Sequence, residues 1–191
     1  DMRMSQSGMS AADVVNTWSQ EELTRILFAY GEESFARAIA RNICQARQEQ
    51  PITTTLQLAE IVKSSVPQRV RRAKKKELAK VFQALRIEVN QEMEALKEML
   101  LAATEALKPG GRLVVITYHS LEDRMVKQQF AKWCQGCTCP PDFPKCVCGK
   151  VPQGKLVNRK PIVADAAELE ENRRSRSAKL RVIERSAAID E

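Results

Sequence analysis

The stretch 107–127 is the feature that most restricts how this chain can fold. A long amphipathic pattern ends at a Pro-Gly-Gly turn, residues 109–111. Residues 113–117 are then apolar with almost no polar alternation, which is typical of a strand buried on both faces in a parallel sheet. Ser120 and Asp123 stand in the N-cap and N3 relation that begins a second helix. The order helix, turn, strand, helix predicts one winding of an open α/β sheet.

Polar residues follow the predicted strand directly. They are Tyr118, His119 and Ser120, and His119 is the only histidine in the chain. Open α/β sheets bind their ligands beyond the carboxyl ends of the strands. We therefore expect these residues to lie at a functional site.

Charge indicates the kind of partner. The 191 residues carry a net charge of +7, which favours an anionic partner, of which nucleic acid is the commonest. No apolar stretch reaches membrane-spanning length and no basic-then-apolar leader is seen, so we expect a cytoplasmic protein without a membrane partner. The chain begins at Asp1 rather than at Met, as a processed or truncated product would.

The first third of the chain reads as helical. Residues 1–9 show no periodicity and are expected to be a loop, whereas 10–68 are expected to form a compact helical subdomain of three short amphipathic helices. The signals for these helices are Ser19 with Glu22, then Phe35, Ile39 and Ile43, then Thr54 with Gln57. The first and third pairs are capping boxes.

A basic run follows, with six basic residues among the eight at 69–76. Two interpretations stay open. The run is either a solvated linker, 69–77, between subdomains, or a phosphate contact for nucleic acid. The candidate RNA-binding residues in it are Arg69, Arg71, Arg72, Lys74, Lys75 and Lys76.

Beyond the run, apolar residues recur at steps of three or four from Leu78 to Leu107. This spacing predicts one continuous helix. A second stripe carries Gln83, Arg86 and Asn90. Such polar residues are either simply solvated or, in the case of Arg86 and Asn90, contacts for RNA phosphates and bases.

The last third alternates helices, loops and strands. We predict a helix at 121–133, a Cys-, Pro- and Gly-rich loop at 134–154, strands at 155–163 and 178–185, and a short acidic helix at 165–171.

Five cysteines lie within fifteen residues of the predicted loop. They are Cys134, Cys137, Cys139, Cys146 and Cys148. Two cysteine pairs around a short Pro-containing turn resemble a zinc knuckle, in which four of the five thiolates would complete a tetrahedral shell. The alternative is a set of free, reduced cysteines. Cys44 is alone on a helix and is expected in the core.

Several blocks together resemble one known family. They are Asp1-Met-Arg-Met4, Tyr30-Gly-Glu-Glu33 with Phe35-Ala-Arg37, Pro51-Ile-Thr-Thr-Thr55, Phe82-Gln-Ala-Leu-Arg-Ile87 with Asn90, Pro109-Gly-Gly-Arg112, His119-Ser-Leu-Glu-Asp-Arg124, Lys160-Pro-Ile162 and Arg176-Ser-Ala-Lys-Leu-Arg181. In this order they resemble the bacterial small-subunit ribosomal RNA cytosine-N4 methyltransferases of the MraW (RsmH) type. That family uses S-adenosylmethionine.

The resemblance covers nearly the whole chain but only the later part of such an enzyme. It implies an α/β fold, namely the C-terminal part of a Rossmann-like class I methyltransferase sheet with an inserted all-α subdomain. Residues 10–68 would be the insert that recognises substrate, and 78–191 the C-terminal half of the methyltransferase domain. The family's Gly-Gly-His turn, ribose-binding acid and Ser-Ser-Pro-Gln loop do not occur in this sequence, so the cofactor-binding residues are expected upstream of Asp1.

The resemblance also implies a function, the N4-methylation of a cytosine in 16S ribosomal RNA on the small ribosomal subunit; it is compatible with a homodimer. His119 and Ser120 would face the pocket where cytosine meets the methyl donor. His119 would either accept the proton that the amine loses or only cap the following helix. The competing interpretation of this chain is a basic, Cys-rich RNA-binding module without catalysis.

Overall fold

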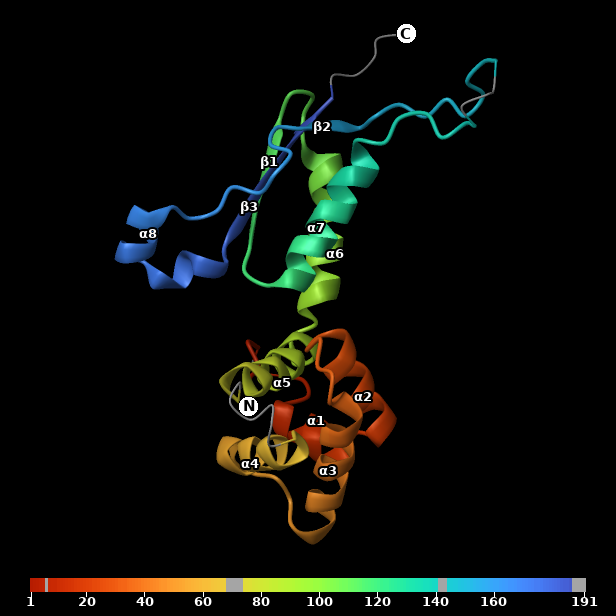
Figure 1. Cartoon of the computed structure of the whole chain (residues 1–191). Helices are drawn as coiled ribbons and strands as arrows, with labels where there is room; N and C mark the ends of the chain where they lie inside the picture. The colour runs from red at the N-terminus through yellow and green to blue at the C-terminus, as the bar shows by residue number, and fades with distance from the viewer. Residues whose placement is uncertain (6, 68–73, 141–143, 187–191) are drawn as a thin grey trace. The chain divides into compact units, whose positions relative to one another are not determined.

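The computed structural model describes residues 1–5, 7–67, 74–140 and 144–186 (Figure 1). The chain forms two compact units, Asp1–Met93 and Glu94–Glu191.

The first unit is helical. Its helices are α1 (Ala11–Thr17), α2 (Gln20–Ala29), α3 (Ala36–Glu49), α4 (Thr55–Ser65) and α5 (Lys74–Val89). The predicted capping boxes at Ser19 and Thr54 are both present, and a third one, which the sequence interpretation missed, starts α1 at Ser10. In each box the N-cap hydroxyl accepts a backbone N–H that would otherwise have no partner.

The core of this unit is built from small and branched side chains. Ile26, Ile39 and Ala40 are fully buried, as are Val81 and Ala84 of α5. The three predicted helices therefore pack as one core with α1 and α5. The helical subdomain extends past residue 68 to include α5.

Close backbone approach fixes the junction of α2 and α5. A Cβ atom on Gly31 would lie 2.6 Å from the Leu27 carbonyl oxygen and 3.0 Å from that of Lys80. Glycine is required there because any side chain would push the two helices apart.

The predicted continuous helix from Leu78 to Leu107 is wrong. α5 ends at Val89, and a separate helix, α6, runs from Glu92 to Ala106. Gln91 between them has a φ of 49°, in the left-handed region that cannot continue a right-handed helix. The apolar residues still recur every three or four positions across the break, because a change of backbone conformation at one residue does not alter the spacing in the sequence.

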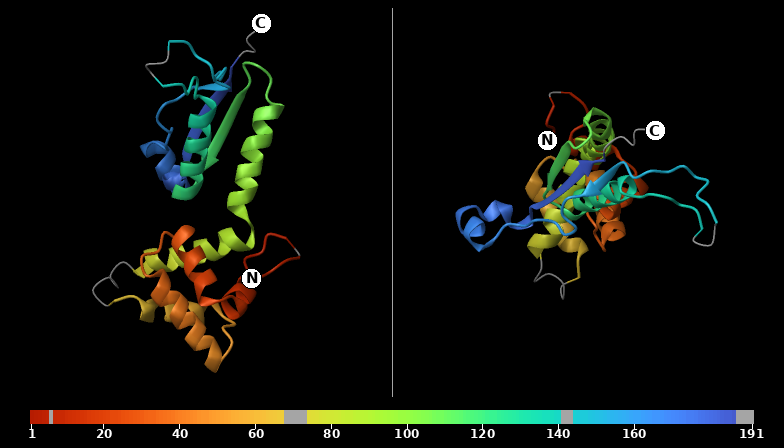
Figure 2. Two further views of the ribbon diagram at one scale, coloured as in Figure 1. Left: turned by 90° about the vertical axis from the view of Figure 1, so that its right-hand side faces the viewer. Right: turned by 90° about the horizontal axis from the view of Figure 1, so that it is seen from above.

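The second unit is an α/β structure. Its strands β1 (Arg112–Thr117), β2 (Gly154–Leu156) and β3 (Lys179–Arg185) form an antiparallel sheet in the order β1-β3-β2. Helix α6 and helix α7 (Ser120–Trp133) lie on the same side of this sheet (Figures 1 and 2). Leu100, Phe130 and Ile183 are buried between them. The guanidinium of Arg185 donates to carbonyls at the C-terminus of α6 and so ties that helix to β3.

Burial of β1 differs from the prediction. Val115 and Thr117 are buried, but Val114 and Ile116 are 53% and 52% exposed. Only one face of the strand is covered, so in this chain the expected burial on both faces is wrong. The strand also lies at the edge of the sheet, and its one described neighbour, β3, runs antiparallel to it.

The remaining elements follow the prediction in part. The strand expected at 155–163 is reduced to β2 and an isolated bridge between Ile162 and Leu180. The acidic helix is present as α8 (Ala166–Glu171) and is followed by a short 3-10 helix, η2 (Arg173–Ser177). The α/β class is thus confirmed, whereas a Rossmann-like strand order stays a prediction because these three strands alone do not reveal it. Across the described residues, none of the helices combines the length and the apolar content that crossing a membrane requires.

Candidate functional site

The polar residues after β1 form a helix cap. His119, not Ser120, is the N-cap of α7, so the predicted cap is displaced by one residue. The His119 Nδ1 accepts the backbone N–H of Glu122 at 3.4 Å, while the Glu122 carboxylate accepts the backbone N–H of His119. The imidazole replaces the serine hydroxyl because its ring nitrogen reaches the same orphan N–H group.

Glu122 holds the imidazole from a second side. Its Oε2 accepts the backbone N–H of Tyr118 at 2.8 Å, and its Oε1 lies 3.2 Å from the Nε2 of His119. Partial burial opposes ionisation of this carboxyl, but the hydrogen bonds from His119 and from the Tyr118 N–H outweigh it and lower the pKa of Glu122. The His119 side chain is only 10% exposed, so both of its nitrogens face protein groups in this conformation.

A charged cluster ties the same helix to the sheet. Asp123 pairs with Arg181, with Oδ1 2.7 Å from Nε, and with Lys179, whose Nζ lies 3.1 Å from Oδ2. The hydrogen bond from Arg181, followed by that from Lys179, lowers the pKa of Asp123 against the effect of burial. Arg181 and Lys179 therefore stabilise the charged form of the buried Asp123 carboxylate and occupy both of its oxygens.

The hydrogen bonds and ion pairs of Glu122 and Asp123 affect whether S-adenosylmethionine could bind at the end of β1. A dinucleotide-type or adenosyl ligand needs a carboxylate that can accept from its ribose hydroxyls. Glu122 and Asp123, the carboxylates next to the end of β1, are both engaged within the protein. Both oxygens of each carboxylate already have a protein partner, which disfavours their accepting the ribose hydroxyls of S-adenosylmethionine.

Arg86 and Asn90, two of the candidate RNA-binding residues, have different partners within the protein. Arg86 forms a two-pronged ion pair with Glu92, at 2.8 and 3.0 Å, which spans the break between α5 and α6. The Asn90 side chain donates to the Met2 carbonyl and accepts the Met4 N–H, holding the N-terminal segment. Both residues thus have structural partners, and an RNA-binding role for them stays a prediction.

The basic run is only partly visible. Arg69, Arg71 and Arg72 lie outside the described residues. Lys74, Lys75 and Lys76 form the first turn of α5, and only their backbone is described.

A cavity of about 590 Å³ lies beside Asn90 in the first unit. Trp18 and the exposed Met4 and Met9 line it together with the end of α5. The sequence interpretation missed this cavity because its walls come from segments almost ninety residues apart, which no local pattern connects.

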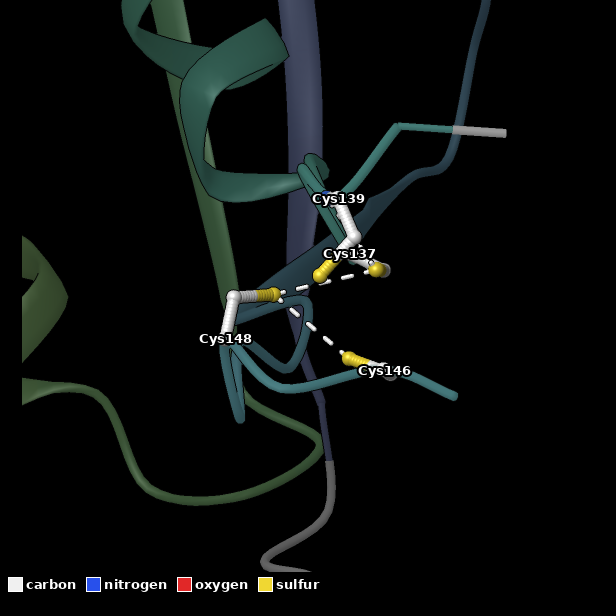
Figure 3. Close-up of side chains that lie close together, drawn as sticks. All are labelled: Cys137, Cys139, Cys146 and Cys148. Atoms are coloured by element: carbon white, nitrogen blue, oxygen red, sulfur yellow. Dashed lines mark hydrogen bonds between the residues drawn. The ribbon is translucent and has the colours of Figure 1, made fainter. Parts of the chain in front are cut away.

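Four of the five clustered cysteines converge. The Sγ atoms of Cys137, Cys139, Cys146 and Cys148 all lie within 4.8 Å of one another. Figure 3 shows their side chains pointing toward a common centre, two from the stretch after α7 and two from the stretch before β2. Cys148 is 3.5 Å from Cys146 and 3.7 Å from Cys137, measured between Sγ atoms. These distances exclude disulfide bonds, which require about 2.05 Å.

The thiols of the cluster differ in pKa. Backbone N–H groups of Thr138 and Lys150, followed by the Cys146 thiol, lower the pKa of Cys148 to about 5. At Cys137 the N–H of Cys139 works in the same direction, but hydrogen bonds with the neighbouring thiols outweigh it and raise the pKa to about 11. The surroundings of Cys148 therefore favour the thiolate form, whereas those of Cys137 favour the neutral thiol.

The fifth cysteine is structural. Cys134 is the C-cap of α7 and packs, half-buried, against the core of the second unit. Burial raises the pKa of its thiol. Cys44 packs against the core of the first unit, as predicted.

Comparison with known proteins identifies the family. A family model described as the MraW methylase family matches residues 1–186. The chain belongs to the MraW methylase family. Three relatives are each named ribosomal RNA small subunit methyltransferase H.

The three relatives are all bacterial. The one from Paenibacillus sp. (strain JDR-2) is 56% identical over 97% of this chain and 59% of its own length. The one from Carboxydothermus hydrogenoformans is 53% identical over 97% of this chain and 60% of its own length. The one from Symbiobacterium thermophilum is 50% identical over 100% of this chain and 60% of its own length. This member of the MraW family therefore spans about 60% of the length of the relatives it matches.

Proposed function

We propose that this chain is the later part of an S-adenosylmethionine-dependent enzyme that methylates the N4 atom of a cytosine in 16S ribosomal RNA. The observation that carries the proposal is the family match over residues 1–186. The names of relatives that are 50–56% identical over nearly all of the chain support a ribosomal RNA substrate. The small ribosomal subunit is the proposed partner, and the cytoplasm the proposed location.

Two features of the second unit support placing the donor site in another part of the protein. The carboxylates beside β1 are already paired. In addition, the outward face of β1 carries the exposed apolar side chains Val114 and Ile116. A sheet face of this kind is stabilised when further structure covers it.

The helices of the first unit are the proposed substrate-recognition region. The basic run 69–76 would supply contacts to RNA phosphates, which depend on charge rather than on sequence. The cavity next to Asn90 has the mixed apolar and polar lining that suits an unstacked base.

His119 keeps a proposed role as acceptor of the proton that the cytosine amine loses, with Ser120 beside it. Two substitutions in the full-length protein separate this role from capping. His119→Ala removes both functions, whereas His119→Asn keeps a side-chain oxygen that caps the helix. If His119 accepts the proton, we expect both variants to lose at least about a hundredfold in methyl transfer while only the alanine variant loses stability. Full activity of the asparagine variant would assign His119 to capping alone.

A second candidate function is RNA binding without catalysis by this chain. It is favoured by the commitment of Glu122 and Asp123 to partners within the protein. One experiment compares the full-length protein and the 191-residue chain, using radiolabelled S-adenosylmethionine with small ribosomal subunits as acceptor. We expect transfer by the full-length protein only.

Calorimetry of the same two samples tests where the donor binds. We expect heat of S-adenosylmethionine binding from the full-length protein and none from the chain. Micromolar binding by the chain would place the donor site within these 191 residues. No transfer by the full-length protein, with RNA binding intact, would favour the binding module.

A further inference from the structure

The described residues of the segment between α7 and β2, 135–140 and 144–153, belong to neither hydrophobic core. The described parts of 135–153 contain no helix or strand, and the apolar side chains Val147 and Val151 are 74% and 52% exposed. Its two ends meet where the Gln153 N–H donates to the Trp133 carbonyl at 2.7 Å. A loop of this length without packed side chains needs some other constraint to hold one conformation.

The four converging thiols provide a place for such a constraint. A zinc ion with Zn–S bonds of about 2.3 Å in a tetrahedral shell places its sulfurs about 3.8 Å apart. Two Sγ separations in the cluster, 3.5 and 3.7 Å, lie close to that value, and all four Sγ atoms are within 4.8 Å of one another. Small shifts of these four side chains, three of them exposed, would therefore complete the shell.

The backbone already supports thiolates in this arrangement. The Cys139 N–H donates to the Cys137 Sγ, and the Val147 N–H donates to the Cys139 Sγ, both at 3.4 Å. Hydrogen bonds of this kind stabilise the negative charge that metal-bound sulfurs carry. The second of them also links the two halves of the segment, because Val147 lies between Cys146 and Cys148.

We propose that Cys137, Cys139, Cys146 and Cys148 bind one structural zinc ion that holds the segment between α7 and β2. Four thiolates in a closed tetrahedron suit zinc and leave no open position for substrate, so the site is structural rather than catalytic. Cys134 takes no part because it packs at the end of α7. The proposal is independent of methyl transfer.

The test is metal analysis of the complete 191-residue chain, produced without an affinity tag and purified without chelator. We expect about one zinc ion per chain. Cys148→Ser should reduce the zinc content to less than about a quarter of that value, because three thiolates bind zinc much more weakly. The matched control Cys134→Ser changes a cysteine only three residues from the cluster and should keep the full zinc content.

Cobalt substitution gives a second readout that does not depend on how a variant folds. The wild-type chain loaded with Co²⁺ should show the strong visible absorption of a tetrahedral thiolate site, and zinc should displace it. Less than about half an equivalent of zinc in the wild-type chain would overturn the proposal. Bound iron in place of zinc, disulfides between these cysteines in mass spectra of freshly purified protein, or equal zinc loss in the Cys134 and Cys148 variants would also overturn it.

Discussion

At the scale of single residues, Glu33 is the buried charge with the clearest consequence. Its side chain is fully buried, its Oε1 accepts the Phe35 N–H at 2.9 Å, and its Oε2 lies 3.7 Å from the Lys80 ammonium. Burial, followed by a hydrogen bond with Glu77, raises its pKa from 4.5 to about 7. Because the carboxyl binds its proton more tightly in the folded state, it favours folding at low pH.

The sign of the pH dependence follows. The contribution of Glu33 is fully present below about pH 4.5 and is lost as pH rises through about 7. We expect Glu33→Gln to remove this loss and to raise the free energy of unfolding at pH 8 by on the order of 1–3 kcal/mol relative to wild type. Urea unfolding at pH 5 and pH 8 measures it. The idea fails if the wild-type protein is equally stable at both values and the variant is no better at pH 8.

At the scale of elements, the break between α5 and α6 depends on one backbone conformation. Gln91 holds a positive φ, which costs free energy for any residue with a Cβ. We expect Gln91→Gly to stabilise the protein by about 0.5–1 kcal/mol. Gln91→Ala, which keeps a Cβ, serves as the control and should gain nothing in the same thermal or urea unfolding measurement. Destabilisation by glycine would argue for a continuous helix.

The uncovered face of β1 leads to a second prediction for this scale. Exposed Val114 and Ile116 on an edge strand form a surface for self-association. We expect the isolated chain to associate and Val114→Lys to reduce association while changing stability by less than about 0.5 kcal/mol. Light scattering coupled to sizing measures both samples. The control Val115→Thr, on the buried face, should lower stability without improving solubility. A monodisperse wild-type chain would contradict the expectation.

The elements also show why sequence reasoning succeeded in some places and failed in others. Capping boxes and apolar stripes are local, so α2, α3 and α4 were predictable from signals such as Ser19 and Thr54. The break at Gln91 is stabilised by distant contacts of Asn90 with Met2 and Met4, and these leave no trace in local spacing. The cysteine site is a similar case. The sequence shows that five cysteines are close together, but only the structure shows that Cys134 caps α7 and stands apart from the other four.

At the scale of the whole molecule, the net charge of +7 is expected to act through RNA. Replacing all six basic residues of 69–76 with glutamine should weaken binding to small-subunit RNA. It should also reduce the slope of log affinity against log salt by up to about four, because fewer counterions are released. Filter binding over a salt series measures the slope. Removing paired cations elsewhere, at Lys63, Lys97 and Arg112, is the control and should have a smaller effect. An unchanged slope would make the run a linker.

The hydrogen bond from Gln153 to the Trp133 carbonyl has a consequence for how this protein can vary. It joins the two ends of a nineteen-residue segment next to the sheet. The backbone N–H of Ser186 donates to the Gln153 carbonyl at 3.0 Å and strengthens this junction. Because the two ends of the segment are already joined, we expect that a tight turn could replace the residues between them without altering the strands. A deletion between these two ends would therefore remove the four clustered cysteines, and with them the proposed zinc site, in a single step.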